Sequence, residues 1–241
     1  MIKIKNLKKK FGDREVLKGI NLDIKSEKTT VVLGVSGGGK STIIKHIIGL
    51  LKADSGEIWI DNRDITKIDE KTLMEIRKDV GFLFQNGALF DSMNVEQNVA
   101  FPLVEHTNMS RREISKEVNR LLDIVGLNPD IVNRLYPDEL SGGMKKRVGL
   151  ARTLALKPKA ILYDEPTSGL DPITSDLISQ LIIKLQHELK TTSVLITHDM
   201  NEAFKCADYL AMLYEGEIIA YDTNENFKKI ENPVIKKFIG L

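Results

Sequence analysis

The chain has 241 residues, enough for one domain with two lobes, and its 35 basic and 34 acidic residues give a net charge of +1, so we expect no nucleic-acid partner. The single cysteine, Cys206, excludes an internal disulfide framework and fits a reducing compartment. No apolar stretch approaches the roughly 18 residues that span a bilayer, and the N-terminus lacks the apolar region of a signal peptide. Any work at a membrane is therefore expected to go through a partner.

The N-terminal region begins with a short basic run and an alternating segment. Lys8–Lys10 is interpreted as a solvated turn, the usual state of such a charge run. Ile20, Leu22 and Ile24 alternate with polar residues, which predicts a half-exposed antiparallel strand.

The segment from Gly34 to Thr42 reads GVSGGGKST and satisfies G-x-x-x-x-G-K-[ST], the phosphate-binding loop. It follows Thr29–Leu33, an apolar run typical of a buried parallel strand. Glycines allow successive N–H groups to point at one anion, and the helix that begins here directs its positive end at the same place. The predicted helix carries Ile43, Ile44, Ile47, Ile48 and Leu51 at helical spacing. Nucleotide contacts are predicted for Gly34, Val35, Ser36, Gly37, Gly38, Gly39, Lys40, Ser41 and Thr42.

A stretch without buried-strand patterns runs from residue 86 to 158. Ser110 and Glu113 form a capping-box pattern before one helical face, and a second helix is predicted from Ser141 to before Pro158. We infer a helical lobe at 86–158, inserted into an α/β core made of residues 1–85 and 159–241.

The α/β core is predicted from apolar runs separated by helical patterns, which together indicate a largely parallel sheet. A hairpin is expected near the C-terminus around Glu215-Gly216. The runs expected to be strands buried on both faces are Val80–Phe84, Ala160–Tyr163 and Ser193–Ile196.

Two adjacent carboxylates end the apolar run Ile161–Tyr163. Asp164 is suited to hold magnesium and Glu165 to polarise an attacking water, because successive strand side chains diverge and can do different work. An acidic turn at a strand end is the alternative, and the phosphate-binding loop upstream argues against it.

A further anion site is predicted at Leu140–Met144. Ser141 is a natural N-cap, and Gly142 and Gly143 clear the approach to a helix N-terminus. A simple well-capped helix would show the same cap. One loop already holds the phosphates of one nucleotide, so this second helix end makes sense if it meets a nucleotide held by another subunit.

These motifs, in this order, resemble the nucleotide-binding subunit of ABC transporters over nearly the full chain. The loop at Gly34 resembles Walker A, Ile161–Glu165 resembles Walker B with its catalytic glutamate, and Leu140–Met144 resembles the LSGGQ signature. Met144 replaces the usual signature glutamine, and phenylalanine stands at position 11 where tyrosine is commoner. The other matches are Gln85 with the Q-loop glutamine, Ser168–Asp171 with the D-loop, His198 with the switch histidine, and Phe11 with the aromatic that stacks on adenine.

The resemblance implies a single ABC ATPase domain over residues 1–241, with a P-loop NTPase core, an antiparallel β subdomain and a helical lobe. It implies that ATP and Mg²⁺ bind, and that two copies form a head-to-tail homodimer in which Ser141, Gly142 and Gly143 close the partner's site. Glu165, His198, Lys40 and Gln85 are then catalytic, and Ser41, Gln85 and Asp164 hold the metal.

Finer resemblance points to a cargo. Phe84–Met93, Asn98–Leu103, Met144 and Asp171–Thr174 are similar to the Mla-type, MCE-associated lipid transport ATPases. This similarity implies phospholipid transport between the inner and outer bacterial membranes. The chain would lie peripherally on the cytoplasmic face of the inner membrane, with a permease, an MCE-domain lipid-binding partner and a STAS-domain subunit.

The apolar residues Leu89, Phe90 and Met93 are expected to be exposed anchors for a permease helix, and packing inside the helical lobe is the alternative. An importer or a lipoprotein-release ATPase is the main competing function. A soluble translation or repair ATPase usually has two cassettes or a long coiled coil, and a P-loop kinase gives no reason for Leu140–Met144.

Overall fold

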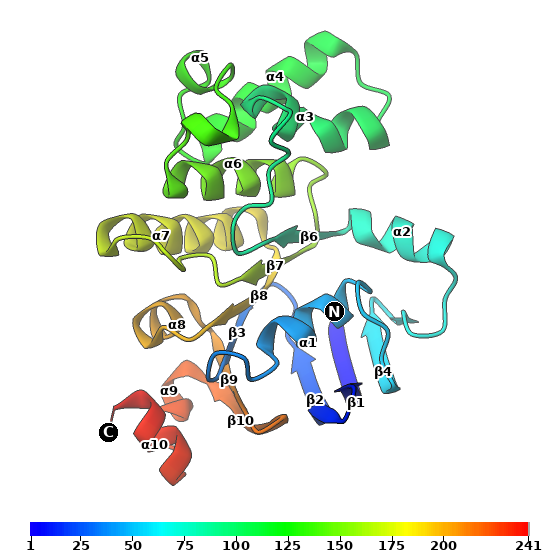
Figure 1. Cartoon of the computed structure of the whole chain (residues 1–241), viewed down its shortest axis with the longest axis vertical. Coiled ribbons are helices and arrows are strands. Elements are labelled where there is room, and N and C mark those ends of the chain that lie inside the picture. The colour runs from blue at the N-terminus through cyan, green and yellow to red at the C-terminus, as the bar shows by residue number, and fades with distance from the viewer. Residues whose placement is uncertain (241) are drawn as a thin grey trace. The chain divides into compact units, whose positions relative to one another are not determined.

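The computed structural model describes residues 1–240 and divides into two compact units (Figure 1). The first unit contains Met1–Arg77 and the stretch from Ile183 onward, and the second contains Lys78–Ile182. Throughout residues 1–240, no helix is both long enough and apolar enough to cross a membrane.

An antiparallel sheet in the first unit has the order β2-β1-β4-β5, and Figure 1 labels its first three strands. The buried face of β2 carries Ile20, Leu22 and Ile24, as their alternation predicts. The prediction of a turn at Lys8–Lys10 was wrong, because pairing with β2 keeps these residues within β1. Lys9 Nζ donates to Asp54 Oδ1 at 2.8 Å, which satisfies its charge beside the strand. The strands are β1 (Ile2–Phe11), β2 (Arg14–Ile24), β4 (Ser55–Ile60) and β5 (Arg63–Asp64).

The remaining strands of the first unit are neighbours in the order β10-β9-β3-β8. β3 is parallel to both β8 and β9, and all five of its residues, Thr29–Leu33, are buried. The predicted hairpin at Glu215-Gly216 joins β9 and β10, and both turn residues have positive φ. The other bounds are β8 (Thr192–Thr197), β9 (Tyr209–Tyr214), β10 (Glu217–Thr223), α8 (Met200–Cys206), α9 (Asn224–Phe227) and α10 (Pro233–Ile239).

Two helices follow the strands of the N-terminal half. α1 (Lys40–Ile47) buries Ile43, Ile44 and Ile47, but it ends before Leu51, so the predicted helix was too long. α2 spans Glu70–Lys78 and buries Leu73 and Ile76. In α8, Cys206 is buried, as expected for a small core residue.

The second unit combines a parallel strand pair with a group of helices, drawn mainly in green in Figure 1. β6 (Val80–Leu83) pairs with β7 (Ala160–Asp164), which is fully buried. The prediction of a fully buried run at Val80–Phe84 was wrong: the strand ends at Leu83, and Gly81 and Phe82 are only half-buried. The helices are α3 (Val95–His106), α4 (Arg111–Ile124), α5 (Pro129–Val132), the 3₁₀ turn Pro137–Glu139, α6 (Gly142–Leu154) and α7 (Pro172–Leu189), which continues past this unit.

Packing among α3, α4 and α6 forms the core of the helical group, with α5 against α4. The predicted capping box is present, since Ser110 accepts from the Glu113 N–H and the Glu113 side chain accepts from the Ser110 N–H. Ser141 caps α6, also as predicted. Among the described residues of 86–158 there is no strand.

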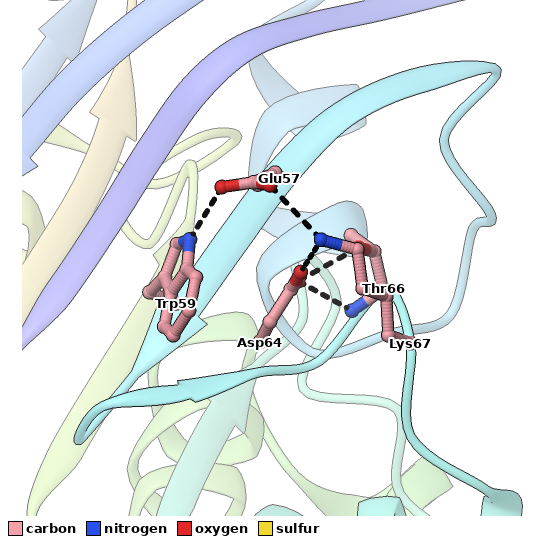
Figure 2. Close-up of polar contacts among 5 residues, drawn as sticks. All are labelled: Glu57, Trp59, Asp64, Thr66 and Lys67. Carbon is pink, nitrogen blue, oxygen red and sulfur yellow. Dashed lines mark hydrogen bonds and ion pairs between the residues drawn. The ribbon is translucent and has the colours of Figure 1, made fainter.

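A polar cluster joins β4 to the segment after β5 (Figure 2). Lys67 Nζ lies 2.7 Å from Asp64 Oδ2 and 2.9 Å from Glu57 Oε1, and Trp59 donates to Glu57 Oε2 at 2.9 Å. Thr66 donates to Asp64 Oδ1 from both its N–H and its hydroxyl. Burial of Asp64 raises its pKa, but the bonds from Lys67 and Thr66 outweigh that effect and hold the pKa below its ordinary value.

Replacing Asp64 by asparagine is expected to lower the free energy of unfolding by about 1–3 kcal/mol at neutral pH, because the buried one of the two carboxylates that pair with Lys67 is lost. Since the folded-state pKa of Asp64 is depressed, its contribution is present above the unfolded-state pKa and is lost as the pH falls through the lower folded-state pKa. Urea denaturation should therefore show the difference between Asp64→Asn and wild type shrinking below the ordinary carboxyl pKa of 3.8. Asp61→Asn, at an exposed turn, is the control, and a difference independent of pH would contradict the assignment.

Candidate nucleotide-binding site

The loop after β3 contains glycines at positions where a residue with a side chain would not fit or would be strained. A Cβ on Gly34 would lie 2.5 Å from the Leu213 carbonyl oxygen, so β9 packs directly against the start of the loop. Gly39, the N-cap of α1, has a φ of 103°, which is a left-handed conformation that favours glycine. The chain therefore reaches α1 by a tight path, with Val35, Ser36 and Gly37 exposed along it.

Lys40, at the first turn of α1, is only 4% exposed. Its Nζ donates to the carbonyl oxygens of Gly34 at 2.9 Å and Val35 at 3.1 Å, which places a positive charge inside the loop. Ser41 and Thr42 follow on the same turn and are half-buried. The loop thus combines a fixed cation with the positive end of a helix, the arrangement that binds phosphate.

Two further residues predicted to contact the nucleotide, His198 and Phe11, belong to the first unit. Because Leu33 pairs with Thr197 in the parallel β3–β8 ladder, Gly34 and His198 leave the same edge of the sheet, and His198 is exposed. Phe11, at the end of β1, is 47% exposed, so its ring offers a face for stacking. Arg14 was not predicted from the sequence; it donates to the Gly37 carbonyl at 3.3 Å and so supports the loop.

The second unit brings Gln85 and the carboxylates to the end of its own strand pair. Leu83 pairs with Tyr163, so the residues after each strand lie at one edge. Asp164 is 7% exposed at the end of β7. Gln85 Nε2 lies 3.5 Å from Glu165 Oε2 and 3.2 Å from Ser168 Oγ.

At the start of α6, the Ser141 hydroxyl accepts from the Met144 N–H at 3.3 Å. Gly142 is exposed, whereas Gly143 is buried against α7: a Cβ there would lie 2.5 Å from Thr174 Cγ2. The two glycines of this motif therefore have different environments in the chain itself.

The loop of residues 86–94, after Gln85, is organised by the buried side chain of Asn98. Its Nδ2 donates to the carbonyls of Phe90, Met93 and Asn94 at 2.9–3.1 Å, and its Oδ1 accepts from the Phe90 N–H at 2.8 Å. The structural role of Asn98 could not be predicted from the sequence, although Asn98 lies within a segment that resembles lipid transport ATPases.

Arg152 of α6 holds the other side of the 86–94 loop. It donates to the carbonyls of Gly87 and Ala88, each at 2.8 Å, and to Asn98 Oδ1 at 3.3 Å. Burial lowers the pKa of Arg152 below its ordinary value. Its guanidinium also lies 5.3 Å from the centre of the Phe90 ring.

Phe90 is 41% exposed, and its ring centre lies 4.9 Å from that of Phe101. Leu89 and Met93 are half-buried, so the expectation of three exposed anchors holds for Phe90 and is wrong for the other two. The result is one exposed aromatic ring on a loop held by a buried polar network.

The chain matches the family of ABC transporters over residues 17–168. It is 42% identical to a probable ribonucleotide transport ATP-binding protein of Mycobacterium leprae, over 99% of this chain and 68% of that protein. Similar mycobacterial proteins are covered over 66% of their length, so the chain spans about two thirds of these relatives.

Two other relatives are of comparable similarity. The intermembrane phospholipid transport ATP-binding protein MlaF of Haemophilus influenzae is 40% identical, over 99% of this chain and 90% of that protein. The methionine import ATP-binding protein MetN of Campylobacter jejuni is 41% identical, over all of this chain and 76% of that one.

Among solved structures, a dimeric ATP-binding cassette in a post-hydrolysis state, bound to ADP and Pi, superposes with a TM-score of 0.85 and 37% identity. The superposition covers 93% of this chain and 99% of the other. These similarities confirm the expected fold class, an α/β P-loop NTPase. The chain belongs to the ABC transporter family and is one of its ATP-binding and ATP-hydrolysing subunits.

Proposed function

We propose that this subunit hydrolyses ATP with the residues that the motifs single out. Lys40 and the N–H groups of the loop at Gly34 hold the β- and γ-phosphates, and Phe11 stacks on adenine. Glu165 orients the attacking water, and His198 contacts the γ-phosphate. Catalysis then consists mainly of positioning and charge stabilisation, as in other phosphoryl transfers.

Ser41, Gln85 and Asp164 are proposed to hold Mg²⁺. A hydroxyl, an amide oxygen and one carboxylate fit this ion, which prefers oxygen ligands and takes few carboxylates when phosphates and water complete its shell. When bound, the ion would neutralise charge on the phosphates.

Two copies of the chain are proposed to bind ATP together. Ser141, Gly142 and Gly143 of one copy would face the γ-phosphate held by the other, since a helix N-terminus with a hydroxyl cap attracts an anion. The dimeric cassette to which this chain is similar supports the arrangement.

The transported cargo is proposed to be phospholipid, moved between the inner and outer membranes by a complex with a permease and an MCE-domain protein. A STAS-domain subunit is part of the proposal, as is peripheral placement on the cytoplasmic face of the inner membrane. The observation that carries it is the resemblance of Phe84–Met93 and Asn98–Leu103 to lipid transport ATPases, together with the MlaF relative. Overall identity does not separate lipid transport from import, because the methionine importer is 41% identical, so the alternative is the ATPase of another importer or of a lipoprotein-release system.

The exposed ring of Phe90 is proposed as the anchor for the permease. Aromatic side chains on a fixed framework lose little entropy on binding and dominate many interfaces. The bonds from Asn98 and Arg152 fix the 86–94 loop before a partner arrives, which lowers the ordering cost of association.

Membrane pull-down of the tagged full-length chain, with partners identified by mass spectrometry, tests the cargo assignment. Recovery of a permease with an MCE-domain protein is the expected result, and recovery of a solute-binding protein would overturn it. Phe90→Ala should reduce permease recovery about tenfold or more, as loss of an interface anchor does. Ile131→Ala, which removes an apolar side chain that is 67% exposed on α5, is the matched control and should leave recovery unchanged.

A further inference from the structure

Lys146 of α6 is a buried lysine, only 4% exposed. Lysine is almost never fully buried unless its charge is satisfied, because removing an ammonium from water is energetically costly. Its Nζ donates to two main-chain carbonyls, that of Ser168 at 2.8 Å and that of Glu165 at 3.3 Å. The neighbouring Lys145 is half-buried, so the basic run itself does not explain the burial of Lys146.

The two carbonyls are the ends of a tight turn. The Ser168 N–H donates to the Glu165 carbonyl at 3.2 Å, closing residues 165–168. Glu165 has a φ of 47°, a left-handed conformation that is sterically unfavourable for a residue with a side chain. Pro166 follows and disfavours the right-handed helical conformation at Glu165. Such a conformation persists only where its surroundings hold it, and Lys146 holds both ends of the turn.

The backbone angles of Glu165 set the direction of its side chain. Gln85 reaches the other end of that side chain, with Nε2 3.5 Å from Oε2, and it also donates to Ser168 Oγ. Lys146 therefore holds the main chain of Glu165, and Gln85 holds its carboxylate. Lys146 lies only four residues after Gly142, the first residue of α6, so a single helical turn separates it from the motif at Ser141–Gly143.

We propose that Lys146 is a positioning residue for ATP hydrolysis, which keeps the turn of residues 165–168 in the conformation that aims the Glu165 carboxylate at the attacking water. This inference rests on the proposed role of Glu165. The expected consequence is that loss of Lys146 lowers the rate of hydrolysis and leaves nucleotide affinity intact, because its bonds to the Glu165 and Ser168 carbonyls hold the main chain of this turn, whereas the loop at Gly34 is the part proposed to hold phosphate.

The test compares Lys146→Met with Lys146→Arg in the full-length chain, by kcat and KM for ATP, and by affinity for a non-hydrolysable ATP analogue. Lys146→Met should reduce kcat by about 10- to 100-fold with KM and analogue affinity within about twofold, since a misplacement of about 1 Å costs up to 10² in rate. Lys146→Arg keeps a charged donor and should recover most of the rate. Lys145→Met, the adjacent lysine on the same helix, is the matched control and should behave as wild type.

Hydrogen exchange by mass spectrometry adds a direct readout. Peptides covering residues 165–169 should exchange faster in Lys146→Met than in Lys145→Met. If Lys146→Met does not fold, Lys146→Gln takes its place, with the same expected loss of kcat and faster exchange. A methionine or glutamine variant that folds and keeps kcat within twofold of wild type would overturn the inference, as would equal losses of kcat and analogue affinity.

Glu165→Gln, measured in parallel, distinguishes a failure of the inference about Lys146 from a failure of the proposed role of Glu165. If Glu165→Gln hydrolyses ATP at the wild-type rate, the proposed role of Glu165 fails. If Glu165→Gln is inactive and Lys146→Met keeps its kcat, only the inference about Lys146 fails, and the proposed role of Glu165 stands.

Discussion

Glu165→Gln is expected to reduce kcat for ATP hydrolysis by at least about 100-fold while ATP still binds. The amide cannot accept a proton or polarise water as the carboxylate does, and loss of such a group typically costs 10²–10⁴ in rate. Glutamine keeps the size of the side chain and an oxygen for the bond from Gln85 Nε2, so the turn at Glu165 should stay formed. Steady-state kinetics, together with titration of a non-hydrolysable analogue, measure both effects.

Glu105→Gln, at an exposed position near the end of α3, is the control for removing one negative charge and should leave kcat unchanged. Because the variant still binds ATP, the proposed dimer should accumulate with ATP, which light scattering can follow. Hydrolysis by Glu165→Gln at the wild-type rate would remove Glu165 as the residue that orients water.

Lys40→Ala is expected to weaken ATP binding itself by on the order of 100-fold, equivalent to about 2.7 kcal/mol. Charged hydrogen bonds contribute about 1.5–3 kcal/mol, and this ammonium lies inside the loop that would surround the phosphates. Lys40 also holds the carbonyls of Gly34 and Val35, so the variant loses loop order as well as charge. Isothermal titration calorimetry with ATP measures the loss directly.

Lys45→Ala, on the same helix, serves as the control, because Lys45 is half-buried outside the loop. An unchanged dissociation constant in Lys40→Ala would argue against the loop as the phosphate site. If ATP binding is weakened equally in Lys40→Ala and Lys45→Ala, the cause is damage to α1 and not loss of a phosphate contact.

Most of the strands could be predicted because local composition and burial agree. Thr29–Leu33, Ala160–Tyr163 and Ser193–Ile196 are apolar runs, and each lies in a strand whose residues are all buried. At Lys8–Lys10 composition and structure disagree, since pairing with β2 imposes a strand on charged residues. Tertiary pairing overrides local preference in such places.

The motif residues could be located from the sequence because each motif is local, and their roles toward ATP stay predictions. The residues that hold the loops around these motifs could not be found from the sequence, because their contacts are distant along the chain. Lys146 contacts residues 19 and 22 positions away, and Arg152 contacts residues 64 and 65 positions away. In the sequence, Lys146 stands in the basic run of Lys145–Arg147, which is typical of a solvated helix face. Only the folded chain shows which of these cations is buried.

The different surroundings of Gly142 and Gly143 decide how genetic data on the motif at α6 should be interpreted. At Gly143, any larger residue must first displace Thr174 of the same subunit, so an inactive variant there is equally explained by a misplaced helix. At Gly142, an added methyl group would meet only the flexible end of Leu170, at 3.3 Å. Gly142→Ala is therefore the substitution whose phenotype reports on the proposed contact with a neighbouring subunit's nucleotide, and screens that pool the two glycines would confuse a folding defect with loss of that proposed contact.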